Sequence, residues 1–400
     1  MIIREGVQPA GGAFRSGVGF AESSRSRHDV LHRLGVGLGI VLLCAACGRT
    51  VTAATECGGP GGRALALQRT SGGGVSSVSL ADHPESPAAE ASLRDASRDA
   101  PYDAAQGAAQ DAARDTAEDA WHYLQLQTGL GPRNPGSPGH RRLVDFLVSE
   151  LAKSADDVQV QPFNVVYEGA AYSMANVTAL FRSSTGGEKP FILLGAHFDT
   201  RPRAECDAVP ARRSIPIVGA NDGASGVAVL LEIASVLART RPPVPVMIAF
   251  FDGEDLGAST SSMFLGSRHL AGKTDPSDVR CMVLLDMVAD ADLDIYIEGN
   301  SHLSSPDLVD TVWSAAERLG YGRVFHREVR YHILDDHVPF IERGIPAVDI
   351  IDFDYPYWHT TLDTPDKCSP KSLQIVRDVI LDVILRDESA SLSLHEPDGF

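Results

Sequence analysis

Short apolar runs alternate with amphipathic segments from residue 140 to residue 385 of the chain. Runs that are apolar, or that alternate apolar and polar positions, predict strands, and they cover residues 158–166, 175–181, 191–196, 244–251, 282–285 and 347–351. Apolar residues at helical spacing predict helices, and they cover residues 140–153, 224–237, 308–319 and 372–385. Strands that alternate with helices favour an α/β fold. We therefore expect a single domain with a mostly parallel central sheet and helices on both of its faces.

The segment before this pattern has a different composition. Residues 48–113 are rich in Gly, Ala, Ser and Asp and contain few large apolar side chains. Such a segment cannot bury enough apolar surface to offset its chain entropy, so we predict a disordered tether. Helical propensity begins near Asp111, and we place this domain at residues 114–390, followed by a tail at residues 391–400.

Residues 1–47 have the character of a signal or lipoprotein segment. An apolar run over residues 35–46 ends in small residues directly before Cys47, as in a bacterial lipoprotein cleavage box, although Cys44 departs from that pattern. The run is too short to span a bilayer as a helix of the mature protein. We therefore predict a cell-envelope or secreted protein whose only membrane contact is a lipid anchor on Cys47.

Two further interpretations of the N-terminus stay open. An ordinary signal peptide would be cleaved near Ala46 or Ala54, without lipidation. The residues before Val30 are unusual ahead of a signal, and Val30 read as an alternative initiator would place the true start near residue 30.

The charge balance and the cysteines narrow the functional classes. The chain has 53 acidic and 35 basic side chains and a net charge of -18 at pH 7, which argues against nucleic-acid binding through a basic surface. The four cysteines outside the signal region show neither the spacing of a cysteine zinc motif nor that of a disulfide framework.

Five separated segments place acidic or imidazole side chains at or near the ends of apolar runs. Ligands in parallel α/β sheets bind at the carboxyl ends of the strands, and zinc binds imidazole nitrogen and carboxylate oxygen. Taken singly, each side chain has an ordinary interpretation as a helix cap, a solvated turn or a local hydrogen bond. Together they predict a zinc enzyme, and the side chains are His197, Asp222, Glu254 with Asp255, Asp286 and His359.

Three local patterns refine this hypothesis. Glu254 and Asp255 are adjacent, so one can bind the metal while the other acts as general base. Two adjacent acids precede a histidine at residues 335–337, which is typical of either a hydrogen-bond network or a solvated loop. Trp358 and Tyr355 beside His359 are candidates for the floor of a substrate pocket, with core packing as the alternative.

From about Asn134 to Leu385 the sequence resembles the glutaminyl cyclases (glutaminyl-peptide cyclotransferases), which share a fold with zinc-dependent exopeptidases and aminopeptidases. The motifs that carry the resemblance are GAHFD at 195–199, GAND at 219–222, FFDGED at 250–255, GSRHL at 266–270, LLD at 284–286, DDHVPF at 335–340 and WHT at 358–360. The resemblance implies an exopeptidase-like fold and peptide or protein N-termini as substrates.

The resemblance also implies roles for individual residues. It implies one zinc ion held by Asp222, Asp255 and His359. It implies Glu254 as general acid and base, with Asp286 and Asp335 as supporting catalytic residues. The reaction would convert an N-terminal glutamine to pyroglutamate and release ammonia.

A zinc aminopeptidase is the alternative from the same fold group. There, His197 and Asp286 would hold a second zinc, Asp222 would bridge the two ions, and Glu254 would activate water. The acidic pair at residues 335–336 and Trp358 directly before His359 favour the cyclase.

Two departures from the cyclase pattern concern the metal site and the pocket. The family often has Glu at the position of Asp255, and residues 256–263 lack a tryptophan that some cyclases carry there. A third class, a binding protein that keeps zinc without turnover, has no need of an intact Glu254.

Overall fold

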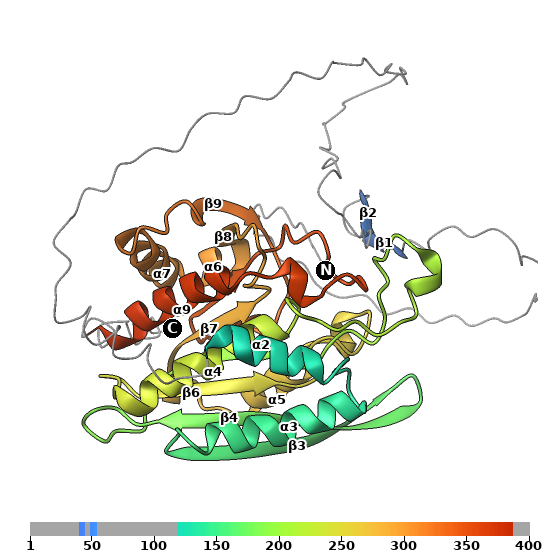
Figure 1. Ribbon diagram of the computed structural model, residues 1–400. Coiled ribbons are helices and arrows are strands. Elements are labelled where there is room, and N and C mark those ends of the chain that lie inside the picture. The colour runs from blue at the N-terminus through green and yellow to red at the C-terminus, as the bar shows by residue number, and fades with distance from the viewer. Residues whose placement is uncertain (1–39, 45–48, 54–118, 387–400) are drawn as a thin grey trace, which may run out of the picture. The chain divides into compact units, whose positions relative to one another are not determined.

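The computed structural model describes residues 40–44, 49–53 and 119–386 (Figure 1). The chain divides into two units, residues 1–57 with 118–400 and residues 58–117, and the second lies outside the described residues. In the first unit, β1 (Ile40–Cys44) and β2 (Arg49–Ala53) pair as an antiparallel hairpin. Cys47, nearly all of the tether and the tail at 391–400 lie outside the described residues, so their assignments stay predictions.

A six-stranded sheet forms the centre of residues 119–386 (Figure 1). Its strand order is β10–β7–β5–β6–β4–β3. The four strands from β10 to β6 run parallel, whereas β4 and β3 run antiparallel at one edge. The expectation of a mostly parallel sheet is therefore confirmed. The bounds are β3 (Asp157–Tyr167), β4 (Ala170–Phe181), β5 (Phe191–His197), β6 (Val246–Phe251), β7 (Val279–Asp286) and β10 (Ala347–Ile351).

The antiparallel edge follows from a two-residue turn between β3 and β4. Glu168 and Gly169 both have positive φ angles, 49° and 78°, as a tight hairpin turn of type I′ requires. A turn of this length returns the chain directly beside the strand it has left, so β3 cannot pair in parallel. The outermost strand, β3, contains Pro162, a residue tolerated in sheets mainly on edge strands.

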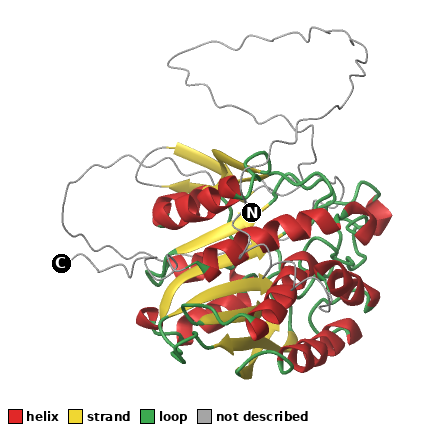
Figure 2. Ribbon diagram, turned by 60° about the vertical axis from the view of Figure 1, so that its left-hand side comes forward, coloured by secondary structure: helices red, strands yellow, loops and turns green. Residues whose placement is uncertain are grey.

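Helices cover both faces of the sheet (Figure 2). The larger core includes Ile192 and Leu194 of β5, and the smaller core on the opposite face includes Leu193, because successive strand side chains alternate between faces. On the first face lie α2 (Ala120–Gly129), α3 (Pro138–Leu151), α4 (Ala224–Arg239) and α9 (Pro370–Leu385), with α7 (Pro306–Arg318) against α9. On the second face lie α5 (Leu265–Lys273) and α8 (Val338–Ile341). Within the described residues, no helix has the length and hydrophobicity that crossing a bilayer requires.

The structure adds elements that the hydrophobic pattern did not predict. They are α5, α8, α6 (Gly299–Ser304) and the parallel pair β8 (Ile295–Glu298) and β9 (Phe325–Tyr331). Each of these elements is short, contains glycine or is largely exposed, so its sequence shows no clear hydrophobic period. The helix expected from Asp111 begins at Ala120 among the described residues, where the Asp119 side chain accepts a hydrogen bond from the His122 N–H.

The parallel strands end at one edge of the sheet, and this edge positions the site. His197 at the end of β5 pairs with Phe251 at the end of β6, and Asp286 at the end of β7 pairs with Ile351 of β10. Loops that leave these strands therefore start side by side, as expected for a ligand site in such a sheet.

Candidate metal centre and active site

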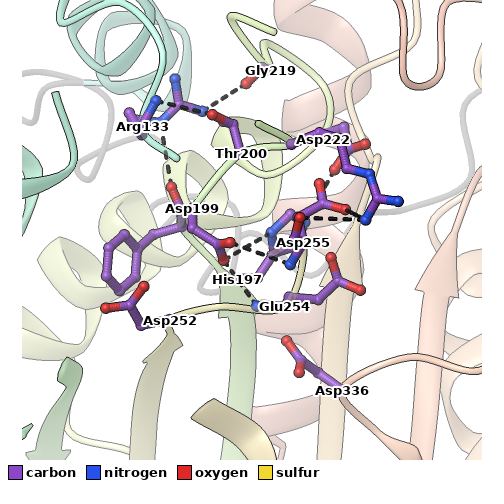
Figure 3. Close-up of polar contacts among 12 residues, drawn as sticks. Arg133, His197, Asp199, Thr200, Gly219, Asp222, Asp252, Glu254, Asp255 and Asp336 are labelled. Carbon is purple, nitrogen blue, oxygen red and sulfur yellow. Dashed lines mark hydrogen bonds and ion pairs between the residues drawn. The ribbon is translucent and has the colours of Figure 1, made fainter. Parts of the chain in front are cut away.

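Two strand ends bring a histidine and an aspartate against the loop before α4. His197 Nε2 lies 3.2 Å from Asp286 Oδ1 and 3.3 Å from Asp222 Oδ1. All three side chains are buried. Figure 3 shows His197 and Asp222 beside Glu254 and Asp255, which follow β6.

Asp222 also faces a second histidine. His359 Nε2 is 3.6 Å from Asp222 Oδ2 and 3.4 Å from Asp255 Oδ1, so the two oxygens of Asp222 face different imidazoles. The structure thus brings together the three ligands expected for a single zinc, with His197 on the other side of Asp222. His359 has a left-handed φ of 53°, a conformation that its surroundings must hold because it is unfavourable for a side chain with a Cβ.

The donor atoms of this cluster fit a divalent cation. Asp222 Oδ2 and Asp255 Oδ2 are buried without a hydrogen-bond partner, and a buried unpaired carboxylate is costly unless a cation compensates it. Among the described residues, ligand atoms of His197, Asp222 and Asp255 all lie within 4.8 Å of one another. Carboxylate oxygens and imidazole nitrogens are ligands that zinc binds, so the residues present fit this metal.

Asp199 fixes the turn that separates Glu254 from Asp255. Its Oδ1 accepts a hydrogen bond from the Glu254 N–H at 3.1 Å, and its Oδ2 accepts one from the Asp255 N–H at 3.2 Å (Figure 3). Gly253, directly before them, has a φ of 76°. The carboxylate lies 3.7 Å from His197 Nδ1, beyond hydrogen-bond distance, so Asp199 orients the backbone of the acidic loop instead of the imidazole.

The two adjacent acids have opposite electrostatic environments. Burial and the charge of Asp255 raise the pKa of Glu254 well above its usual range, and His197 opposes this only partly. Burial also acts to raise the pKa of Asp255, but His359 and Arg201 overcome it and hold that pKa below its usual value. Asp255 is therefore held as the anion, whereas Glu254 keeps its proton to a higher pH than an exposed glutamate, so it can both accept and return a proton.

Two more acids lie behind Glu254, in the loop before α8. Asp335 and Asp336 are buried, and burial with neighbouring negative charge raises the pKa of Asp335 well above its usual range. Burial raises the pKa of Asp336 to about 7, and its Oδ1 accepts a hydrogen bond from the Ser267 hydroxyl. The two carboxyl groups behind Glu254 therefore keep their protons to a higher pH than exposed aspartates do.

The buried His337, at the end of that loop, lies against two further acids, Glu298 and Asp349. His337 Nε2 lies 3.2 Å from Glu298 Oε2, and its Nδ1 lies 3.8 Å from Asp349 Oδ2. Burial raises the pKa of Glu298, but His337 and backbone N–H donors reverse this and lower it to about 2. Asp349 has no hydrogen-bond partner on either oxygen, and burial raises its pKa well above the usual range.

The two predicted pocket aromatics occupy different positions. Trp358 stacks on His359 with ring centroids 3.9 Å apart and planes at 23°, so it lies beside the candidate metal centre. Tyr355 is 3% exposed, and its hydroxyl donates to Asp363. Asp363 in turn accepts the backbone N–H of Asp222 at 3.2 Å. Tyr355 thus lies beneath the site, where it supports the loop that carries Asp222.

Several charged residues of the site were not predicted from the sequence, and three of them lie in loops. Arg201 donates to Asp255, and Glu205 lies against both Arg201 and His359. Arg133 is fully buried and donates to the backbone oxygens of Phe198, Val218 and Gly219 at 3.3, 2.7 and 2.7 Å. It joins the loop before α3 to the loops that follow β5 and precede α4.

Among the charged residues that were not predicted, the sequence contains a usable signal only for Asp349. Asp349 stands inside the apolar run Ala347–Ile351, and a charged residue in a buried strand needs an explanation. Arg201, Glu205 and Arg133 lie in loops, where no period shows which side chains turn inward.

Comparison with known proteins gives the family. Residues 176–384 match peptidase family M28. The chain belongs to this family. It is 32% identical to a glutaminyl cyclase of Bacteroides thetaiotaomicron whose crystal structure has N-acetylhistamine bound, with a TM-score of 0.64 over 67% of this chain and 97% of that one.

Other relatives have different names. A leucine aminopeptidase precursor from Bacteroides thetaiotaomicron is 33% identical, with a TM-score of 0.64 over 67% of this chain and 96% of that one. A glutaminyl-peptide cyclotransferase-like protein of Bos taurus is 26% identical over 272 residues, which cover 60% of this chain and 68% of the relative. These similarities confirm the exopeptidase-like fold.

Proposed function

We propose that this protein is a glutaminyl-peptide cyclotransferase, an enzyme that converts the N-terminal glutamine of a peptide or protein to pyroglutamate and ammonia. Several relatives bear this name, in curated proteins and in solved structures. The observation that carries the proposal over an aminopeptidase is Trp358, which directly precedes His359 and stacks on its ring at the candidate metal centre.

The proposed zinc ligands are Asp222, Asp255 and His359. When bound there, zinc supplies a Lewis acid for the side-chain amide of the substrate glutamine. Asp255 suits this role because it is anionic and buried, with a free oxygen. Asp222 suits it because its Oδ2 faces His359 and has no hydrogen-bond partner.

Glu254 is the proposed proton carrier. The substrate α-amine attacks its own side-chain amide carbon, a new C–N bond closes the ring, and the old C–N bond breaks to release ammonia. The Glu254 carboxylate takes a proton from the amine and returns it to the departing nitrogen, so no net proton is consumed. A carboxyl group with a raised pKa suits both transfers, because the most effective catalytic pKa lies near the operating pH.

Asp286 and Asp335 are the proposed supporting catalytic residues. Asp286 holds His197 through Nε2, and Asp335 contributes negative charge that raises the pKa of Glu254. Trp358 beside His359 provides a flat apolar surface that suits the methylene groups of the substrate's N-terminal glutamine. Holding the amine and the amide together makes the ring closure effectively intramolecular and oriented.

A zinc aminopeptidase is the second candidate, and one observation favours it. His197 Nε2 lies 3.2–3.3 Å from both Asp286 and Asp222, and these three side chains would hold a second zinc ion in such an enzyme. In that enzyme Glu254 would accept a proton from water. Relatives named aminopeptidase or exopeptidase support this alternative.

A product assay separates the two candidates. Purified protein supplied with zinc is incubated with a Gln-Ala-type peptide and, separately, with a Leu-Ala-type peptide. We expect ammonia and a product lighter by one ammonia from the glutamine peptide alone. Free leucine from the second peptide would instead establish the aminopeptidase and a role for His197 as ligand.

We also propose that the protein acts in the cell envelope, anchored by a lipid on Cys47. The support is the apolar run that ends in small residues before this cysteine. Expression in a bacterium followed by detergent phase separation tests it. The protein should enter the detergent phase, and Cys47→Ala should move it to the aqueous phase; equal partitioning of both would contradict the anchor.

A further inference from the structure

One segment between β5 and α4 holds the turn that carries His359. Glu205 Oε1 lies 3.3 Å from His359 Nδ1. The next residue, Cys206, donates its backbone N–H to the His359 carbonyl at 3.1 Å. Asp207 Oδ2 accepts the Thr361 N–H at 3.2 Å and the Thr361 hydroxyl. Three successive residues thus support a turn whose central histidine has an unfavourable φ of 53°.

Of these contacts, the one made by Glu205 is to the imidazole ring, through a carboxylate oxygen. An imidazole can bind a metal through either nitrogen, and the hydrogen bond made by one nitrogen decides which is left free. An acceptor at Nδ1 keeps the proton there and directs Nε2 away from it. Nε2 is the atom that faces Asp222 and Asp255.

Glu205 is also tied to the second proposed ligand. Its Oε1 accepts hydrogen bonds from Arg201 Nε at 2.8 Å, with Nη2 at 2.6 Å. Arg201 Nη1 donates to Asp255 Oδ1 at 3.2 Å and to the Gly257 carbonyl at 2.6 Å. The rigid fork of the guanidinium therefore links the carboxylate on His359 to the carboxylate of Asp255.

We propose that Glu205 is a positioning residue of the metal centre, which orients His359 for metal binding and, through Arg201, sets its placement relative to Asp255. The inference rests on the proposed zinc site but not on the choice between cyclase and aminopeptidase. Hydrogen-bond partners of ligating histidines change metal affinity by about 10- to 100-fold.

Zinc affinity of the full-length protein tests this inference without any substrate. Metal-stripped wild type and Glu205→Leu are titrated with zinc against a competing chelator. Leucine has similar size but accepts no hydrogen bond, so we expect zinc to bind about 10- to 100-fold more weakly. Glu205→Gln keeps an acceptor oxygen for Nδ1–H and should recover most of the loss.

A matched control separates this effect from loss of a surface ion pair. Glu188 Oε1 accepts from Arg182 Nε at 2.8 Å and Nη2 at 2.6 Å, which reproduces the Glu205–Arg201 geometry without a histidine. Glu188→Leu should leave zinc affinity within about twofold of wild type.

Three results would overturn the inference: unchanged zinc affinity in Glu205→Leu, an equal loss in Glu188→Leu, or no recovery in Glu205→Gln. Failure of the wild type to bind zinc would reject the zinc site itself. Zinc binding with equal affinity in all variants would reject only the role of Glu205.

Discussion

The metal side and the acid side of the site use the same kinds of side chain and reach opposite protonation states. On the metal side, Asp255 has His359 and Arg201 as neighbours and is held as an anion. On the acid side, Glu254 and Asp335 have mainly other acids near them, and burial raises both pKa values. The difference shows that the partners, not the residue type or its depth, decide which carboxyl group binds a cation and which carries a proton.

The acid side and the metal side meet at the peptide bond between Glu254 and Asp255. Asp199 accepts the N–H groups of both Glu254 and Asp255, so a single carboxylate fixes the backbone while the two side chains face different environments. Predictions follow from this contrast.

The largest effect is expected from Glu254→Gln. The substitution removes the proposed proton carrier, and general acid–base catalysis contributes roughly 100- to 10,000-fold. Ammonia release from a glutamine peptide should fall by that factor while bound zinc, measured by metal analysis, stays unchanged. Asp255→Asn is the contrasting variant, because it should lose zinc as well as activity. Full activity in Glu254→Gln would mean that the two sides do not divide the work in this way.

Asp352, directly after β10, is a buried acid with other acids near it, and it tests the same effect of burial away from the metal side. Burial raises its pKa to about 7, so the folded state binds a proton that the unfolded state loses near pH 4. This group therefore costs stability as the pH rises from about 4 to 7, by up to about 4 kcal/mol. Asp352→Asn should gain stability relative to wild type over that window.

Chemical unfolding of both proteins at pH 4.5 and pH 8 measures the gain. The amide keeps one acceptor for the Asp294 or Asp354 N–H that the carboxylate now holds. A stability difference that is the same at both pH values would contradict the assigned protonation.

Glu298 should show the opposite sign. Its pKa is lowered to about 2 by His337 and backbone donors that outweigh burial, so it stabilises the fold above about pH 4.5 and loses that effect as the pH falls toward 2. The contribution is about 3 kcal/mol. Glu298→Gln should therefore be less stable than wild type at pH 7, and the gap should narrow at pH 3.

Urea titrations at the two pH values measure that gap. Glu317 is the control, because it pairs with Arg327 at the surface, where such pairs contribute little. An equal pH effect in Glu317→Gln would show that the contacts of Glu298 with His337 and the backbone donors are not the cause.

The smallest effect is expected from Trp358→Leu. Aromatic contacts contribute about 0.5–1.5 kcal/mol beyond their buried area, so the KM for a glutamine peptide should rise by roughly 2- to 10-fold with a smaller change in kcat. Trp358→Phe should keep most of the affinity. Steady-state kinetics on both variants measure the split, and a change in kcat alone would place Trp358 outside the substrate pocket.

The sequence predicted the helices and strands that have a regular hydrophobic period, and the polar residues that stand at strand ends. The runs at 191–196 and 282–285 lie within β5 and β7, and His197 and Asp286 end these strands. The supporting contacts could not be predicted in the same way, because Arg201 and Glu205 meet Asp255 and His359 only after distant loops converge. The residues around Tyr355 and Trp358 in the sequence also do not show that Tyr355 lies beneath the site and Trp358 beside His359.

The proline in the outermost strand has a consequence for handling the protein at high concentration. An edge strand presents unpaired backbone groups to which a second molecule can add a strand. Pro162 has no N–H to donate, and it stands in the middle of β3, so an incoming strand cannot form a continuous ladder along that edge. Replacing Pro162 by valine would restore an unbroken donor row and increase edge-to-edge aggregation, although the site would be untouched.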